Sequence, residues 1–318
     1  MLVINYFNDT HFSPVIPSSR KDDYPETIMS KYRSIQQYSP APIQIIGGDV
    51  FHRSLLPMKY VNWVAEETRK LQEEYQYRTY VISGNHDCSY SNMEYLKESA
   101  LGNFLATGLV EYLDDLSWEI EPGYEVRIKG WNFNKMDPPE VERQKGVFNT
   151  LVGHAFYETS PVLGKDLILT RDQAAESNYD LILLGHDHSK YQNVTVTGRT
   201  GPVLICRPGA LSRGTSHFTQ VWREVSVARV KLEVVDGEIV VDVSNVTIPS
   251  IPPEQAFVGK ARENNKGEMK KAMEDFVKVV MSTEIDATEV GEMLTQLKVE
   301  PKLEGYVRSL LHNYGIIK

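Results

Sequence analysis

The stretch IQIIGGDVFH, residues 43–52, joins a short apolar run to two glycines, an aspartate and a histidine. Runs of Val, Ile and Leu of this length are typical of strands buried in a parallel sheet. The polar residues follow the run, where the carboxyl end of such a strand would lie, and open α/β sheets hold their ligands at that edge. The stretch therefore predicts an α/β fold with its chemistry at the end of a central strand.

The same pattern recurs along the chain. Segments 26–38 and 58–75 carry apolar residues at helical spacing between the first three apolar runs, which predicts crossover helices. Like the run in the opening stretch, the other apolar runs are each followed closely by Asp, Asn, His or Gly. The predicted strands cover residues 2–7, 43–47, 78–83, 147–153, 180–184 and 202–206.

The last third of the sequence differs in character. Segments 223–235 and 238–248 alternate apolar and polar residues around Asp236-Gly237, which is typical of a β-hairpin. Three prolines within 248–253 predict an extended linker, and helical spacing returns between residues 266 and 313. We therefore divide the chain into a catalytic region (1–218), a small β-containing cap with a linker (219–253) and a helical tail (254–318).

Composition excludes several classes of protein. A chain of 318 residues with 41% hydrophobic and 24% charged residues is an ordinary globular protein. Its net charge of −9 argues against a protein that coats nucleic acid by bulk attraction. No run approaches the roughly 18–20 apolar residues of a membrane span, and we expect no signal peptide. Two cysteines exclude a disulfide framework, although one bridge stays open, so we expect a cytoplasmic protein.

One segment is locally basic. Between His186 and Lys231, basic residues far outnumber acidic ones, which fits either a solvated strand surface or a rim that contacts phosphate. The basic residues are Lys190, Arg199, Arg207, Arg213, Arg223, Arg229 and Lys231.

Five short clusters carry donors for a metal. Six of the eight histidines fall inside them. Neutral histidine, carboxylate and amide oxygen together suit divalent ions such as Mn²⁺, Fe²⁺ and Zn²⁺. Each cluster alone has an ordinary explanation as a turn or a cap, but five in succession after predicted strands indicate a catalytic metal site. The clusters are Asp9-Thr10-His11, Gly48–His52, Gly84–Asp87, Gly153-His154 and Gly185–His188.

This order of clusters resembles the calcineurin-like metallophosphoesterase superfamily over residues 1–215. The resemblance implies a two-layered β-sandwich flanked by helices, and two divalent ions that share Asp49. It favours Mn²⁺, with Mg²⁺, Fe²⁺ and Zn²⁺ as alternatives, and it makes His86 a catalytic residue that stabilises or protonates. The first ion would be held by Asp9, His11, Asp49 and His188, and the second by Asp49, Asn85, His154 and His186.

Two segments narrow the resemblance to one branch. Gly48–His52 resembles the corresponding motif of SbcD-type nucleases of DNA double-strand-break processing, and Arg207–Arg213 resembles their later Pro-Gly-Ser segment. This implies that His52 assists exonucleolytic cleavage of DNA, and that the helical tail binds an SMC-like ATPase. We further expect Asp87, or another carboxylate, to orient the ring of His86.

Other functions use the same ligand set. A small-molecule phosphodiesterase or a protein phosphatase would need the same metal cage, because a fold does not fix a substrate. A non-catalytic assembly subunit is disfavoured because every expected metal and catalytic position is filled. Whether two copies of the chain pair as a homodimer stays open.

Overall fold

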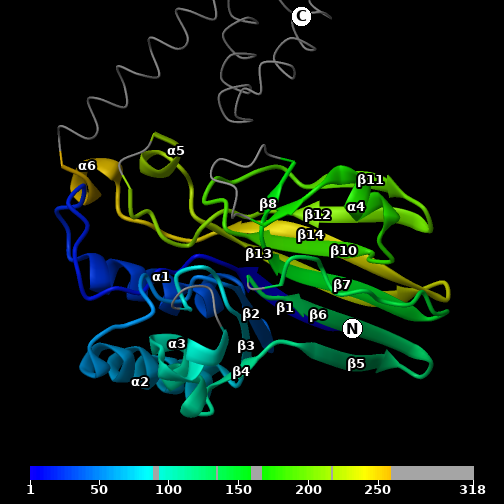
Figure 1. The fold of residues 1–318 in the computed structure, drawn as a ribbon, viewed down its shortest axis with the longest axis horizontal. Helices are drawn as coiled ribbons and strands as arrows, with labels where there is room; N and C mark the ends of the chain where they lie inside the picture. The colour runs from blue at the N-terminus through cyan, green and yellow to red at the C-terminus, as the bar shows by residue number, and fades with distance from the viewer. Residues whose placement is uncertain (89–92, 134, 159–166, 216–217, 259–318) are drawn as a thin grey trace, which may run out of the picture.

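Two sheets of six strands each pack face to face in a computed structural model that describes residues 1–88, 93–133, 135–158, 167–215 and 218–258 (Figure 1). The first sheet has the order β14-β13-β1-β2-β3-β4. Its strands β1 to β4 are parallel, so the chain must cross over between them, and helices make the first two crossovers. These elements are β1 (Leu2–Phe7), α1 (Tyr24–Tyr38), β2 (Ile43–Gly47), α2 (Met58–Tyr75), β3 (Arg78–Ile82), β4 (Val110–Tyr112), β13 (Ser226–Val235) and β14 (Glu238–Thr247).

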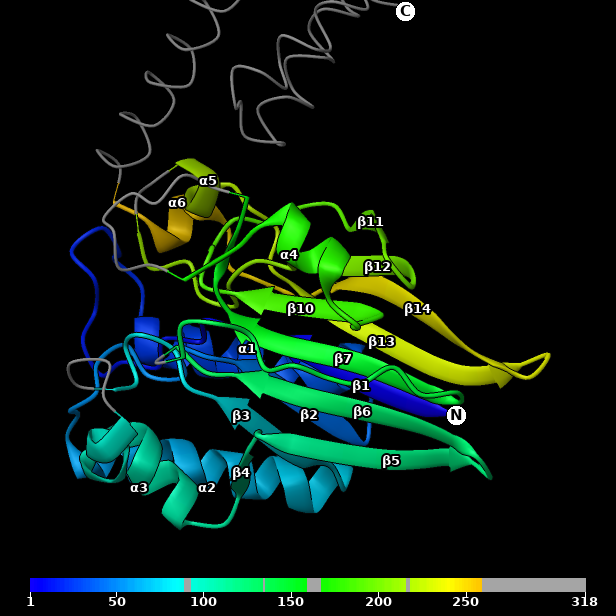
Figure 2. The ribbon, with the colours of Figure 1, turned by 45° about the vertical axis from the view of Figure 1, so that its right-hand side comes forward.

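The second sheet has the order β11-β12-β10-β7-β6-β5, and Figure 2 shows its strands side by side with α4 over them. The four inner strands are parallel and the two edge strands are antiparallel to their neighbours. The sheet consists of β5 (Asp115–Glu121), β6 (Tyr124–Trp131), β7 (Val147–His154), β10 (Leu181–Gly185), β11 (Val194–Gly198) and β12 (Gly201–Cys206). Short elements complete the described part: η2 (Met93–Glu98), α3 (Ala100–Ala106), β8 (Phe156–Tyr157), β9 (Ile168–Leu169), α4 (Arg171–Glu176), α5 (Phe218–Val221) and α6 (Pro253–Ala256).

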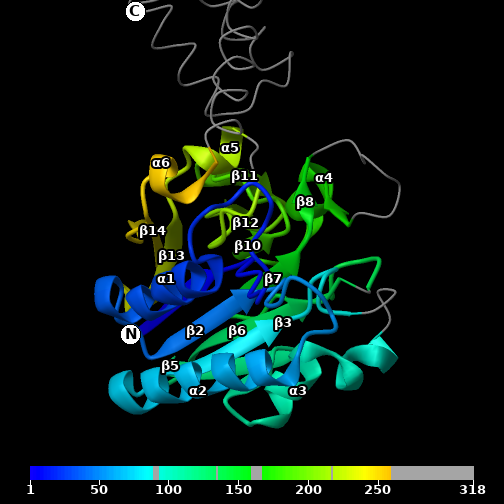
Figure 3. The same cartoon turned by 90° about the vertical axis from the view of Figure 1, so that its left-hand side faces the viewer.

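Each sheet is covered on both faces, which explains its continuous apolar runs. In β10, Leu181 and Leu183 enter the core between the two sheets, whereas Ile182 and Leu184 enter the core on the outer face with α4. Successive residues of a strand point to opposite faces, so a strand buried on both sides must be apolar throughout. Figure 3 shows α1 and α2 against the outer face of the first sheet. The layers therefore run helix, sheet, sheet, helix.

The predicted fold class is confirmed: the protein is a mixed α/β sandwich flanked by helices. Each of the six predicted strands matches an observed strand within one residue at either end. No helix among the described residues is both long and apolar enough to cross a membrane. The predicted tail helices beyond residue 265 lie outside the described residues.

The β-hairpin after residue 223 forms as predicted and joins the first sheet. Its strand β13 pairs antiparallel with β1, with Ile4 opposite Val230, and β14 pairs with β13 around the turn at Asp236. The hairpin therefore extends the first sheet, because the buried face of β13 continues the core of β1. The proline segment that follows is also packed: Ile248 is buried, and its N–H donates to the carbonyl of Val225 at 2.8 Å.

Candidate metal centre

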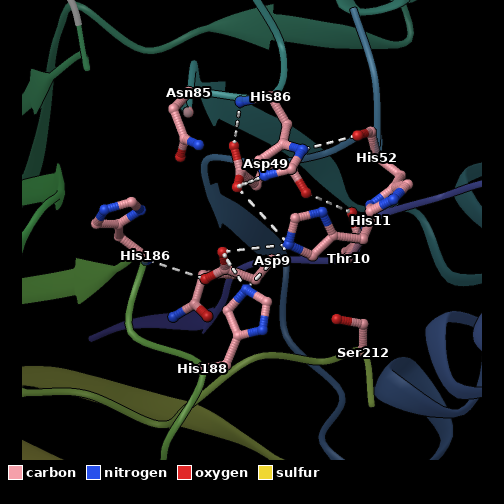
Figure 4. A network of polar contacts seen from close by, with 12 residues as sticks. Asp9, Thr10, His11, Asp49, His52, Asn85, His86, His186, His188 and Ser212 are labelled. Atoms are coloured by element: carbon pink, nitrogen blue, oxygen red, sulfur yellow. Dashed lines mark hydrogen bonds and ion pairs between the residues drawn. The ribbon is translucent and has the colours of Figure 1, made fainter. Parts of the chain in front are cut away.

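The five clusters of possible ligands meet at one edge of the sandwich. They follow the carboxyl ends of β1, β2 and β3 in the first sheet and of β7 and β10 in the second. Because parallel strands end at the same edge, loops that are distant in sequence lie together there. Figure 4 shows candidate ligands from these loops gathered around one centre, among them Asp9, His11, Asp49, Asn85 and His188. All nine predicted site residues lie in this group: Asp9, His11, Asp49, His52, Asn85, His86, His154, His186 and His188.

The backbone is strained where the ligand loops turn. Asp9, His11, Asp49 and His186 have φ angles of 50°, 45°, 50° and 80°, in the left-handed region that residues with a Cβ rarely adopt. Such a residue costs about 1–3 kcal/mol and persists only where the surroundings enforce it. Here hydrogen bonds between loops enforce it: the N–H of Asp9 donates to the carbonyl of Gly48, and that of His11 to the carbonyl of Asp49, both at 3.0 Å.

Four side chains form the first half of the centre, namely Asp9, His11, Asp49 and His188. The Nε2 atoms of His11 and His188 lie 3.0 Å apart. Asp9 Oδ1 is 3.4 Å from His188 Nε2 and 3.7 Å from His11 Nε2, and Asp49 Oδ2 is 3.6 Å from His11 Nε2. Donor atoms from three loops thus converge on one point.

The second half comprises Asp49, Asn85, His154 and His186. His154 Nε2 lies 3.2 Å from Asn85 Oδ1, 3.2 Å from His186 Nδ1 and 3.5 Å from Asp49 Oδ2. The other ring nitrogen of His154 donates to the carbonyl of Gly47 at 2.8 Å, which fixes the tautomer and leaves Nε2 as the ligand atom. Asp49 Oδ2 faces both halves and therefore lies where a shared ligand must lie.

Comparison with known proteins agrees with this geometry. The profile of the calcineurin-like phosphoesterase family matches residues 2–190. The chain belongs to this family. A comparison with curated proteins finds no match.

Solved structures similar to this phosphoesterase differ in function. A dimetal phosphatase from Danio rerio has 9% identity and a TM-score of 0.41, with 79% of this chain and 99% of that one covered. A nuclease from Pseudomonas putida has 12% identity and a TM-score of 0.31, with coverage of 74% and 85%. Vacuolar protein sorting 29 from Cryptosporidium parvum has 12% identity and a TM-score of 0.29, with coverage of 77% and 98%. Likeness this distant does not decide the substrate.

The donor set of the phosphoesterase fits a pair of divalent cations. Ring nitrogens and carboxylate oxygens that bring lone pairs toward one another repel unless a proton or a cation lies between them. Asp9 Oδ1 is buried and accepts no hydrogen bond from the described residues. Three overlapping groups have ligand atoms within 4.8 Å of one another: Asp9, His11 and His188; Asp9, Asp49 and His154; and His11, His52 and His86.

The charges of the site also favour cations. Burial lowers the pKa of His11 to about 3, so this ring is neutral and can bind a metal. Burial disfavours the charge of His154, yet the Asp49 carboxylate outweighs burial and raises the pKa of His154 to about 9. For Asp49, burial is likewise outweighed by the charge of His154 and the hydrogen bond with it, so the pKa of Asp49 falls below the ordinary value. In the absence of metal, a proton on His154 supplies positive charge that a cation supplies otherwise.

Two glycines let the loops of the phosphoesterase approach one another. Gly48 has a φ of 88°, and a Cβ there would overlap the ring of His154. A Cβ on Gly84 would overlap the carboxylate of Asp49. The glycines that flank the ligands in the sequence are therefore required by the close approach of the ligands themselves.

Asp87 holds two loops together and does not orient His86 as predicted. Its buried carboxylate accepts hydrogen bonds from the N–H groups of Gly84 at 3.0 Å, Val50 at 3.2 Å and Phe51 at 3.1 Å. Burial, and then the charge of Asp49, raise the pKa of Asp87 to about 7. The carboxylate points back into the loops because backbone donors surround it there, so another group must orient the ring of His86.

The carbonyl of His52 orients the ring of His86. His86 Nδ1 donates to this oxygen at 2.7 Å, which directs Nε2 toward the centre, 3.9 Å from Asp49 Oδ2. The two rings stack, with centroids 5.4 Å apart and planes 23° from parallel. Both lie beside the ring of His11, at centroid distances of 4.9 Å for His86 and 5.4 Å for His52. The two histidines thus form a pair at the rim of the first half of the centre.

Two aromatic residues beside the second half were not identified from the sequence. The ring of Phe156 meets that of His186 edge to face, with centroids 4.3 Å apart, and the ring of Phe133 lies 5.6 Å from it. These rings form an apolar wall that holds the imidazole in place. A signal for Phe156 was its position two residues after His154, whereas nothing in the local sequence marked Phe133.

Proposed function

We propose that this phosphoesterase hydrolyses phosphodiester bonds of DNA as a Mn²⁺-dependent exo- and endonuclease of the SbcD type. When two divalent cations are bound at such a site, they lower the pKa of water and neutralise charge on the oxygens of the phosphoryl group. The side chains that would hold them are Asp9, His11, Asp49, Asn85, His154, His186 and His188.

The stacked pair of His52 and His86 is the observation that carries this proposal. His86 Nδ1 is engaged by the carbonyl of His52, so the second ring nitrogen is free to meet a substrate at the rim. Its side chain is 38% exposed, which leaves room for that contact. An alkoxide leaving group such as a DNA strand needs a proton, and a positioned imidazole can donate it.

His52 supports this role electrostatically. Burial, and then the neighbouring charge of His86, lower the pKa of His52. The lowered pKa of His52 reduces repulsion between the two stacked rings. The arrangement gives the two histidines separate tasks, with His86 as proton donor and His52 as the residue that supports exonucleolytic cleavage.

The proposed cellular role is the processing of DNA ends in repair or recombination. In this proposal residues 254–318, which lie mostly outside the described residues, bind an SMC-like ATPase, and a second copy of the chain can complete the assembly. Cys88 and Cys206 are both buried and do not form a disulfide, which supports a reducing compartment such as the cytoplasm.

One observation favours a second candidate, a small-molecule phosphodiesterase or protein phosphatase. The hairpin β13–β14 extends the first sheet, so within the described parts of the chain no separate cap follows the catalytic region. A nuclease that grips duplex ends benefits from such a cap, whereas a small diester or a phosphoprotein needs none.

Digestion of end-labelled linear duplex DNA by the purified chain tests the proposal. Reactions would contain Mn²⁺, Mg²⁺ or a chelator, with the variant His86→Ala as control and bis(p-nitrophenyl) phosphate as a small diester. We expect shortening of the DNA that requires Mn²⁺ and that the variant lacks. Hydrolysis of the small diester without cleavage of DNA, also in the presence of the ATPase, would refute the nuclease and support the second candidate.

A further inference from the structure

Arg207 is the first residue after β12 and lies at the edge of the second sheet that carries the metal ligands. Strand β12 pairs in parallel with β10, with Cys206 opposite Leu183, and β10 pairs in parallel with β7. Arg207 therefore leaves its strand at the edge where His154 ends β7 and His186 follows β10. This topology places a basic side chain beside the second half of the metal centre.

Two tyrosine rings hold the guanidinium group of Arg207. Its Cζ lies 4.0 Å from the ring centroid of Tyr191 and 5.0 Å from that of Tyr157. Tyr191 is itself fixed, because its hydroxyl donates to Asp187 Oδ2 at 2.7 Å and its N–H donates to the carbonyl of Arg207 at 3.1 Å. Since Asp187 lies in the middle of the loop His186–His188, the stack is joined directly to the metal ligands. A guanidinium held against aromatic rings keeps its terminal nitrogens, Nη1 and Nη2, as donors in the guanidinium plane.

Arg207 forms no ion pair within the described parts of the chain, and the charges of Asp187 and Glu158 act on it only from beyond ion-pair distance. Its buried Nε makes no hydrogen bond there. Burial lowers the pKa of Arg207, yet a guanidinium stays charged in proteins, so the group is a partly desolvated cation. Other basic residues of this segment do have partners: Lys190 pairs with Glu224, Lys231 with Glu233, and the carbonyls of Ile251, Ser212 and Pro40 accept from Arg213, Arg223 and Arg229.

We propose that Arg207 binds a phosphate group of the DNA other than the one that is hydrolysed. A fixed guanidinium with a free edge matches the oxygens of a phosphate, and the negative charge offsets the cost of desolvating the cation. The inference rests on the proposed function, because a substrate with a single phosphate fills the metal centre and leaves Arg207 without a ligand. The residue therefore selects polynucleotides over small esters.

The test compares Arg207→Gln, Arg207→Lys and the control Arg199→Gln. Arg199 is exposed and lies in the turn before β12, whereas Arg207 follows the strand. The six residues of β12 span roughly 20 Å by strand rise, so Arg199→Gln removes the same charge beyond the far end of the strand. The readouts are KM for a labelled DNA and for bis(p-nitrophenyl) phosphate, and the slope of log(kcat/KM) for DNA against log of salt concentration. Each phosphate contact contributes about 0.7 to 0.9 to that slope.

For Arg207→Gln we expect KM for DNA to rise about tenfold relative to KM for the small diester. We also expect the magnitude of the salt slope to fall by the contribution of about one phosphate contact. Arg207→Lys should keep the slope but bind more weakly, because an ammonium does not stack as a plane. An Arg207→Gln variant with the salt slope of the unmodified protein and of Arg199→Gln overturns the inference. So does an equal loss on both substrates, which marks a structural role. If the unmodified protein cleaves no DNA, the proposed function fails instead.

Discussion

Replacing His86 with alanine removes the ring from the rim of the metal centre but keeps the bonds that hold the centre. The backbone N–H of His86, which alanine retains, donates to Asp49 Oδ1 at 2.9 Å, whereas the ring Nε2 lies 3.9 Å from Asp49 Oδ2, beyond hydrogen-bonding distance. A positioned proton donor contributes about 10²- to 10⁴-fold in rate, or about 2.7–5.5 kcal/mol of activation free energy. We expect kcat for DNA to fall by that factor while the metal content is unchanged.

The assay for His86→Ala measures kcat on DNA and on bis(p-nitrophenyl) phosphate, together with bound Mn²⁺. Because p-nitrophenolate leaves as a stable anion, it needs no proton. The fold-decrease in kcat for the small diester should therefore be about ten times smaller, or less, than the fold-decrease for DNA. Loss of metal together with activity would show that His86 is a ligand. Equal losses on both substrates would refute its role as proton donor to the leaving group.

Three further predictions follow from the same geometry. His52→Ala should impair digestion of duplex ends selectively, and an unaltered digestion profile would contradict this. Asp49→Ala should abolish binding of both ions, measured by calorimetric titration, because Oδ2 lies 3.6 Å from His11 Nε2 and 3.5 Å from His154 Nε2; retention of one tight site would argue against a shared ligand. Since the pKa of His154 is about 9, its ring is protonated at pH 7 before metal binds. Binding of Mn²⁺ at pH 7 should therefore release protons, seen as a dependence of the binding enthalpy on the buffer, and affinity should rise with pH toward 9.

The central strands were predictable because both of their faces are buried. Strand β10 is apolar along its length and β2 is interrupted only by Gln44, so their sequences alone mark them. The edge strand β5 was missed although its residues alternate between exposed polar and partly buried apolar side chains, because in this part of the chain only continuous apolar runs were taken as strands. The hairpin β13–β14 was recognised from its alternation and its turn, but alternation does not say which strand it will join. Its pairing with β1 depends on the folded core, which the local sequence does not show.

The identity of the candidate ligands could be read from the sequence, but their geometry could not. Glycine beside Asp49 or His186 signals a tight loop, yet the left-handed φ angles of these two residues are imposed by contacts between loops. The orientation of His86 was missed for a similar reason. Every residue has a backbone carbonyl, so the sequence does not show that the carbonyl of His52 accepts from His86. Arg207 was one of seven basic residues in its segment, and only the structure shows the two rings that hold it.

A crystal grown with Mn²⁺ and measured at the manganese absorption edge tests the central claim most directly. We expect two anomalous peaks that share Asp49. One would lie within bonding distance of Asp9, His11 and His188, and the other within bonding distance of Asn85, His154 and His186. A single peak, or an ion held by His52 and His86, whose ring nitrogens also lie within 4.8 Å of those of His11, would contradict the account.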